Sequence, residues 1–276
     1  MIHVATVHWR SARWIDIQAR FLQRCLGDSH RVYAFLNEVP DEYSARFFYV
    51  SREKIKAHPT KLNLLCDVIR VAADPADLLL VLDGDAFPVA PIAPLVERRL
   101  PAHRLIAVQR YENEGELQPH PCFCLTTVGF WTEIGGDWHK GHEWRDLHGR
   151  PVTDVGGNLL ARLESAAVDW YPLRRVNRVD LDPVFYGLYG DRELGPLVYH
   201  HGAAFRPGME RAHYRALDGS PVKASILGRQ SPFWRLLGAR HPHKRRLMSL
   251  KSRKGEVGDE LLRRAAQDEG FWRALA

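Results

Sequence analysis

The sequence has few cysteines and no long apolar run, and each shortage excludes a class of protein. Four cysteines in 276 residues are too few and too scattered for a disulfide framework, so we expect reduced thiols. The longest aliphatic run, residues 78–82, is far too short to cross a bilayer. The first residues lack a basic leader followed by an apolar stretch. We therefore expect a cytoplasmic protein.

The positive charge is concentrated in the C-terminal part of the chain. From Lys223 onward there are thirteen Lys and Arg against five Asp and Glu, so the rest of the chain is slightly acidic. We predict a main domain over residues 1–222 and a basic, mainly helical extension over residues 223–276. Three alternatives stay open for the extension: peripheral contact with an anionic membrane or an acidic partner, packing within the chain or in a homo-oligomer, and a solvated segment. Nucleic acid is not expected, because no recognised binding module accompanies the charge.

Strand-like and helix-like segments alternate along the chain. Residues 78–82 have no polar alternation, as in a central strand covered on both faces. The alternation predicts an α/β fold with a Rossmann-like, mostly parallel sheet flanked by helices, and a ligand crevice beyond the carboxyl ends of the strands. The predicted strands are residues 2–7, 31–36, 47–50, 78–82, 105–109, 123–131, 170–173 and 197–200. The predicted helices are residues 14–26, residues 60–73 and one that begins near residue 153.

Asp83-Gly84-Asp85 directly follows the most apolar predicted strand. Two carboxylates two residues apart on an extended segment point to the same side, and the glycine leaves room for a ligand to approach the backbone. Hard oxygen ligands of this kind suit Mn²⁺ or Mg²⁺ shared with phosphate oxygens. The alternative is a solvated turn, and the position after a buried strand favours the metal.

The triplet in this setting resembles that of the GT-A glycosyltransferases, in which it holds the metal on a nucleotide-sugar diphosphate. The upstream stretch Asn63-Leu64-Leu65-Cys66-Asp67-Val68-Ile69-Arg70 looks like the Asp-x-x-Arg helix of retaining transferases related to the clostridial toxin glucosyltransferases and the yeast initiating mannosyltransferases. The resemblance implies that Asp67 and Arg70 contact the donor sugar, with Arg70 close to the chemistry. The alternative is a surface ion pair. Lys61 lies in the first turn of the same helix. It either binds the donor phosphates, which a helix N-terminus favours, or is an ordinary exposed lysine.

The stretch Tyr199-His200-His201-Gly202-Ala203-Ala204-Phe205-Arg206-Pro207 resembles the His-x-x-Gly-x-x-Lys-Pro motif of the glycogenin-like and lipopolysaccharide galactosyltransferase group. In that group the histidine completes the metal site and the lysine reaches the diphosphate. The resemblance implies His200 as the third metal ligand and Arg206 as a donor-binding residue, since arginine also binds phosphate oxygens. The glycine comes one residue early, which leaves His201 as the alternative ligand.

The acceptor side is marked by Asp154, whose place in the chain looks like the segment that GT-A enzymes present to the acceptor. Asp154 would orient or deprotonate an acceptor hydroxyl, or the Thr153-Asp154 pair is only a helix N-cap. Trp131, Trp138 and His139 belong to a region suited to stacking on sugar rings, or to a loop packed by its own aromatics. By the same resemblance, Thr6, Val7 and His8 hold the nucleobase of the donor through backbone groups.

These residues together predict a metal-dependent glycosyltransferase, with residues 1–222 as its catalytic domain. The donor is a nucleotide-diphospho-hexose, with GDP-mannose slightly favoured over UDP-hexose because the Arg- and Ala-rich composition is typical of GC-rich bacteria that build polysaccharides from GDP-mannose. The acceptor is a saccharide or glycolipid hydroxyl. Retention is favoured by the motifs, and inversion with Asp154 as base is the rival. The alternatives are a sugar-nucleotide phosphohydrolase, a nucleotidyltransferase and a non-catalytic carbohydrate-binding scaffold. A nucleotidyltransferase normally has a glycine-rich phosphate loop near its first strand, and residues 6–13 offer none.

Overall fold

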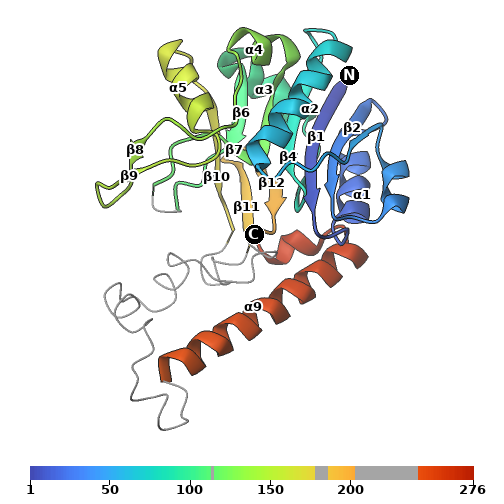
Figure 1. The fold of residues 1–276 in the computed structure, drawn as a ribbon, viewed down its shortest axis with the longest axis vertical. Helices are drawn as coiled ribbons and strands as arrows, with labels where there is room; N and C mark the ends of the chain where they lie inside the picture. The colour runs from blue at the N-terminus through green and yellow to red at the C-terminus, as the bar shows by residue number, and fades with distance from the viewer. Residues whose placement is uncertain (113–114, 178–185, 203–241) are drawn as a thin grey trace.

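A ten-stranded sheet, with helices on both of its faces, forms the body of the protein in the computed structural model (Figure 1). The structure describes residues 1–112, 115–177, 186–202 and 242–276, and of residues 242–254 it describes the backbone alone. The strand order is β3-β2-β1-β4-β7-β6-β10-β11-β12-β5. The strands of this sheet are β1 (Ile2–Trp9), β2 (His30–Asn37), β3 (Tyr49–Ser51), β4 (Leu78–Asp83), β5 (Ala86–Pro88), β6 (Leu105–Val108), β7 (His120–Thr127), β10 (Tyr171–Arg175), β11 (Gly187–Asp191) and β12 (Gly195–His200).

The helices connect these strands and cover the sheet. They are α1 (Ile15–Leu26), α2 (His58–Ala72), α3 (Ala93–His103), α4 (Val128–Glu133), α5 (Gly157–Ser165) and α9 (Pro242–Gln267), with the short 3-10 helices η1 (Asp41–Arg46) and η2 (Phe271–Ala274). A separate two-stranded ribbon is formed by β8 (Trp144–Arg145) and β9 (Pro151–Val152). No helix in the described part of the chain is long and apolar enough to span a membrane.

The predicted α/β class and mostly parallel sheet are confirmed. The pairings β2-β3, β1-β2 and β1-β4 are parallel, which is the βαβ arrangement expected from the first half of the sequence. Seven of the ten strands share one direction, and β7, β11 and β5 run against it.

Two hydrophobic cores lie on opposite faces of the sheet because successive strand residues point to opposite sides. Ala5 of β1 and Leu79 of β4 pack with residues of α2, α4 and α5. Val4 and Leu80, their neighbours in the chain, pack instead with residues of α1 and α3. β4 is therefore apolar on both faces, as the unbroken run of residues 78–82 predicted.

Two predicted element boundaries were wrong. The strand predicted over residues 123–131 ends at Thr127, whose hydroxyl accepts a hydrogen bond from the Phe130 amide at 3.1 Å and starts helix α4. The helix predicted from about residue 153 begins at Gly157, after Gly156 in a left-handed conformation with φ of 91°. Neither Thr153 nor Asp154 is therefore the N-cap of α5.

The strand β12 reaches the carboxyl end of β4 through an unusual pairing. Only two residues separate β4 from β5, yet β5 pairs with the distant strand β12, in a register that places His200 opposite Ala86. The amide of His201 also donates to the carbonyl of Asp85 at 3.0 Å. This pairing carries the end of β12 to the residues that follow β4.

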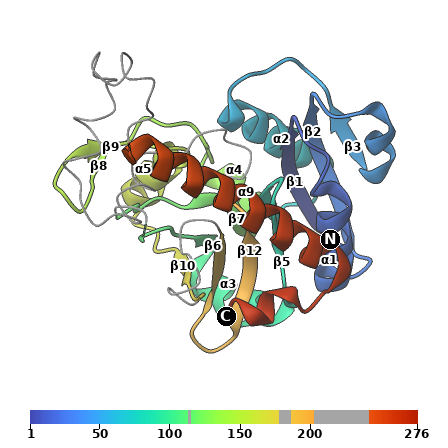
Figure 2. The ribbon, with the colours of Figure 1, turned by 90° about the horizontal axis from the view of Figure 1, so that it is seen from below.

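The last turns of α9 and the helix η2 pack against the rest of the described structure. Leu261, Ala265, Phe271 and Leu275 are buried in a cluster with residues of α1, β5 and β12. Arg13 pairs with Asp259 at 2.6 Å on the surface of the same contact. Figures 1 and 2 show α9 running across the lower end of the molecule, with its last turns beside α1. These contacts agree with intramolecular packing of the tail, while membrane contact and self-association stay predictions.

Candidate metal centre

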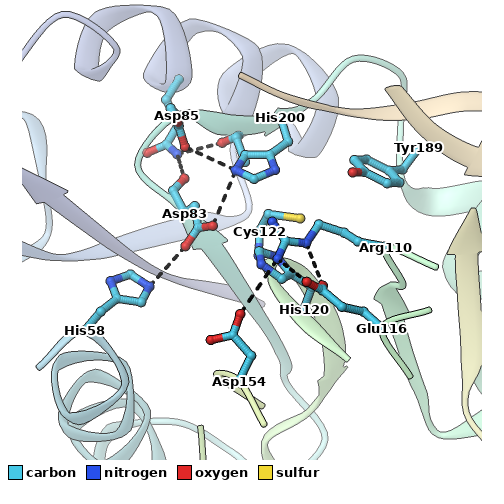
Figure 3. A network of polar contacts seen from close by, with 12 residues as sticks. His58, Asp83, Asp85, Arg110, Glu116, His120, Cys122, Asp154, Tyr189 and His200 are labelled. Carbon is cyan, nitrogen blue, oxygen red and sulfur yellow. Dashed lines mark hydrogen bonds and ion pairs between the residues drawn. The ribbon is translucent and has the colours of Figure 1, made fainter. Parts of the chain in front are cut away.

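Asp83, Asp85 and His200 meet at the carboxyl end of β4 (Figure 3). One ligand atom from each residue lies within 4.8 Å of the other two. The Nε2 atom of His200 is 3.5 Å from Oδ2 of Asp83 and 3.5 Å from Oδ1 of Asp85. The structure therefore brings together the three residues that the sequence predicted as metal ligands.

The donor set fits a small divalent ion. An octahedral ion about 2.1 Å from each oxygen separates its ligand atoms by roughly 3 to 4.2 Å, which is close to the spacing of this cluster. The two carboxylates also match the preference of Mn²⁺ and Mg²⁺ for hard oxygen ligands. His201 points elsewhere: its Nδ1 lies 2.8 Å from the Tyr199 hydroxyl, and its ring packs 4.6 Å from Trp14. Of the two histidines, His200 is the one placed to bind a metal.

Gly84 is required by the packing of the triplet against β1. A Cβ atom at this position would lie 2.4 Å from the Val7 carbonyl oxygen and 2.8 Å from Nδ1 of His8. The space beside the glycine is thus filled by β1 itself. The expectation that Gly84 leaves room for a ligand is therefore wrong. Gly84 allows the turn between Asp83 and Asp85 to lie directly against the end of β1.

Gln18 of α1 holds this turn in place. Its Nε2 donates to the carbonyl oxygens of Asp83 at 2.9 Å and Ala86 at 2.7 Å. Its Oε1 lies 3.3 Å from the Thr6 hydroxyl and 3.2 Å from Nε2 of His8. The side chains of Thr6 and His8 are therefore used to orient Gln18, and burial lowers the pKa of His8 to about 4, so its ring is neutral near pH 7. One signal in the sequence could have identified Gln18: it is a polar residue on the apolar face of its helix.

His58 contacts the metal cluster from the opposite side to His200. It is the first residue of α2, and its Nε2 lies 3.1 Å from Oδ1 of Asp83 (Figure 3). Burial opposes ionisation of Asp83, but the hydrogen bond from His58 and the nearby imidazoles hold the pKa of its carboxyl well below its usual value. Asp83 therefore stays a carboxylate, and His58 fixes one of its oxygens, as outer residues of metal sites do.

Two buried histidines beside the cluster have opposite electrostatic environments. Burial and then the charge of Arg110 lower the pKa of His120 well below its usual value, so this ring is neutral. Burial also disfavours the charged form of His200, but Cys122 and Asp85 outweigh it and raise the pKa of His200. A divalent ion would replace the proton that His200 holds between the two carboxylates.

Asp154 lies at the edge of the same region, held by two cations. Its Oδ1 is 3.0 Å from Nζ of Lys140, and its Oδ2 is 3.9 Å from Arg110. Figure 3 shows its side chain pointing toward Arg110, which is itself in a bidentate pair with Glu116 at 2.9 Å. Asp154 is therefore near the predicted crevice, with both carboxylate oxygens already engaged.

The Asp67 and Arg70 pair lies away from the metal cluster. His58 stands at the start of α2, and a helix rises about 1.5 Å per residue, so Arg70 is roughly 18 Å farther along the axis. Asp67 and Arg70 contact each other at 3.4 Å with both side chains largely in solvent. This is the surface ion pair of the alternative interpretation. Lys61, by contrast, is buried rather than an exposed lysine, and burial lowers its pKa.

The predicted aromatic acceptor residues are mostly in the core. Trp131 and Trp138 are 4% and 0% exposed and stack on each other at 5.5 Å, so neither presents a face to a sugar. This corrects the expectation for both, because their rings complete the core under α2 and α5. His139 is partly exposed and remains available. Arg206 lies outside the described residues.

No protein-family model and no curated protein matches the chain. Several solved structures are similar to it. The galactosyltransferase LgtC in complex with donor and acceptor sugar analogs is 11% identical, with a TM-score of 0.34, over 48% of this chain and 59% of that chain. The mannosyltransferase PcManGT from Pyrobaculum calidifontis, in complex with GDP-Man and Mn²⁺, is 12% identical, with a TM-score of 0.36, over 50% of this chain and 47% of that chain.

A putative glucose-1-phosphate thymidylyltransferase from Bacillus anthracis is 11% identical, with a TM-score of 0.37, over 79% of this chain and 96% of that chain. The chain thus matches about 59% of the length of the LgtC structure and about half of the mannosyltransferase. Identities and TM-scores this low establish no activity, which has to be argued from the residues of this chain.

Proposed function

We propose that the protein is a metal-dependent glycosyltransferase that moves a hexose from a nucleotide-diphospho-sugar to a hydroxyl acceptor. The cluster of Asp83, Asp85 and His200 carries this proposal. It lies at the carboxyl end of a buried strand, where open α/β sheets bind their ligands. Its donors suit an ion that is shared with a diphosphate.

The residues around the cluster have separate tasks in this proposal. Asp83, Asp85 and His200 hold Mn²⁺ or Mg²⁺, which supplies the positive charge that stabilises a leaving diphosphate. His58 and Gln18 keep Asp83 in place through its carboxylate and its carbonyl. The backbone of Thr6, Val7 and His8 faces the nucleobase, and Lys61 and Arg206 bind the donor phosphates. Asp154 and His139 lie on the acceptor side.

The sugar and the stereochemical course are less constrained than the reaction class. GDP-mannose stays slightly favoured over UDP-hexose, and a saccharide or glycolipid remains the proposed acceptor in polysaccharide assembly. Retention drew part of its support from the Asp67 and Arg70 motif, and those side chains lie far along α2 from the cluster. The course of the reaction therefore depends on which groups surround the acceptor hydroxyl.

The first experiment measures nucleotide release. The purified chain is incubated with UDP-, GDP- and ADP-sugars, with Mn²⁺ or with chelator, and the products are separated by chromatography. We expect nucleoside diphosphate from one donor, abolished by chelator and by Asp85→Asn. Asp41→Asn, at a position 93% exposed in its side chain, is the matched control and should behave like the wild type.

The products also separate the alternatives. Nucleoside monophosphate with sugar phosphate indicates a phosphohydrolase, and inorganic diphosphate from a nucleoside triphosphate indicates a nucleotidyltransferase. Metal-dependent nucleotide binding without turnover indicates a scaffold. If neither turnover nor metal-dependent nucleotide binding is found, the proposed function is wrong.

A further inference from the structure

Asp137 is the centre of a fully hydrogen-bonded group beside the start of α2. Its Oδ1 accepts from Nδ2 of Asn63 at 2.7 Å and from the His139 amide at 2.9 Å, and its Oδ2 accepts from Nδ2 of Asn158 at 2.8 Å. Asn63 is fixed in turn, because its Oδ1 accepts from the Trp138 amide at 2.9 Å. The Asp137 carboxylate is thus held in one orientation by residues of α2 and α5.

These contacts determine the tautomer of His139. Burial opposes ionisation of Asp137, but its hydrogen bonds lower its pKa to about 2, so it is an acceptor only at neutral pH. Its Oδ1 lies 2.7 Å from Nδ1 of His139, and this contact requires the proton on Nδ1. Nδ2 of Asn63 is also 3.0 Å from Nδ1, but it donates to the shared carboxylate oxygen. In the neutral ring, the Nε2 atom of His139 then carries the lone pair.

A hydroxyl group already occupies that lone pair. The Thr60 hydroxyl lies 3.0 Å from Nε2 of His139, so it donates to the imidazole. Carboxylate, imidazole and hydroxyl are in hydrogen-bonding order, which is the arrangement of a base that accepts a proton from an alcohol. The His139 side chain is 44% exposed, so an alcohol from solution can reach it.

His139 is connected to the metal cluster by a short series of contacts. His58 and Thr60 lie in the same first turn of α2, and His58 touches Asp83 at 3.1 Å. On the other side, Lys140 follows His139 in the chain and pairs with Asp154 at 3.0 Å. The first turn of α2 thus contacts Asp83 through His58 and His139 through Thr60, and the residue after His139 contacts Asp154.

Asp154, the base suggested by the sequence, is less suited to accept a proton. Its Oδ1 is paired with Lys140 and its Oδ2 faces Arg110, so protonation would give up both interactions. His139 has one nitrogen supported by a carboxylate and the other turned toward a hydroxyl. The two candidates thus differ in which one has a lone pair ready for an alcohol.

We propose that His139 is the catalytic base for the acceptor and that Asp137 is its positioning residue; this inference rests on the proposed glycosyltransferase function. The acceptor hydroxyl takes the place of the Thr60 hydroxyl and gives its proton to Nε2. Its oxygen forms a bond to the anomeric carbon, the bond from that carbon to the phosphate oxygen breaks, and the electron pair leaves with the nucleoside diphosphate. One displacement of this kind inverts the anomeric configuration. The proton on His139 then passes to water.

The test compares transfer and binding in the same variants. Wild type, His139→Ala and Asp137→Asn are assayed with the donor that the wild type uses, with Mn²⁺, and with 4-nitrophenyl hexosides or water as acceptor. We expect His139→Ala to lower kcat by about 10²- to 10⁴-fold, the usual contribution of a general base. Mn²⁺-dependent donor Kd should change by less than about twofold, and free imidazole should restore part of the activity of His139→Ala.

The controls separate a chemical role from a structural one. His148→Gln, in the exposed ribbon loop, should match the wild type. Asp137→Asn should lower kcat while leaving the Mn²⁺-dependent donor Kd unchanged. Free imidazole should not restore the activity of Asp137→Asn, because the His139 imidazole is still present in this variant and lacks only its carboxylate partner. Proton NMR of the fresh wild-type product should show the inverted anomer.

Three results would overturn the inference: wild-type kcat in His139→Ala, a retained anomer in the product, or a loss of donor binding equal to the loss of activity. In each case wild-type transfer would still stand, so the proposed function would survive. If the wild type neither turns over nor binds any donor with Mn²⁺, both proposals are wrong.

Discussion

Replacing Gly84 by alanine should damage the metal centre without removing any ligand. The new Cβ would lie 2.4 Å from the Val7 carbonyl oxygen, a backbone atom near the end of β1 that cannot turn aside. Restoring even 3.0 Å requires a shift of 0.6 Å or more between β4 and β1. Overpacking of this kind costs about 1–3 kcal/mol. The shift also moves Asp83 relative to Asp85, and displaced support of metal ligands lowers affinity by about 10- to 100-fold.

The assay measures Mn²⁺ affinity by titration calorimetry and the free energy of unfolding in urea. Gly255→Ala is the matched control, since a Cβ at that helical position meets nothing within 4 Å. It should leave Mn²⁺ affinity unchanged and stabilise α9 by about 0.5–1 kcal/mol. A Gly84→Ala protein with wild-type Mn²⁺ affinity and wild-type stability would refute the account of the triplet as a turn packed on β1.

Three further changes test other contacts. Gln18→Leu removes the donor to the carbonyls of Asp83 and Ala86, so we expect about 1–3 kcal/mol of destabilisation in urea and weaker Mn²⁺ binding. Unchanged Mn²⁺ affinity would show that Gln18 does not hold the turn. The pKa of His8 falls from 6.5 to about 4 on folding, so the unfolded chain binds more protons between these values and stability is lost as pH falls. Between pH 7 and pH 5.5 the free energy of unfolding should fall by about 1 kcal/mol more in wild type than in His8→Asn. If the free energy of unfolding falls equally with pH in both proteins, the His8 ring is not buried and neutral. Phe271→Ala should lower the free energy of unfolding by about 3–5 kcal/mol, because the Phe271 ring packs on Phe21 and Tyr199. Leu147→Ala, at an exposed position, is the control and should change it little. A small effect of Phe271→Ala on the melting temperature would mean that the C-terminal segment is not docked.

Local pattern predicted the first half of the fold and the metal carboxylates. The strand of residues 78–82 and the carboxylates after it are read directly from the sequence, because a strand buried on both faces must be apolar and its end opens into the crevice. The second half was harder, since Thr127 starts a helix that an apolar run alone does not distinguish from a strand.

The supporting residues of the site could not be predicted in the same way. Gln18 and His58 are ordinary polar residues in sequence, and each acts on a partner far away in the chain. Asp137 contacts His139 two residues later, but Asn63 and Asn158, which orient it, are distant in sequence. Asp67 and Arg70 show the opposite case. Their spacing matches a functional motif, yet their place on α2 leaves them as a surface pair.

The sequence by itself determined the class of the fold and the position of the two carboxylates of the candidate metal centre, because both follow from periodicity and from residues next to each other in the chain. The tertiary structure decided which histidine meets those carboxylates, since only the pairing of β5 with β12 turns His200 toward them and His201 toward Trp14. It also decided that His139 has a supported imidazole and Asp154 does not have a free carboxylate. Hydrogen bonds between distant residues depend on how the sheet is assembled, and no local pattern encodes that assembly.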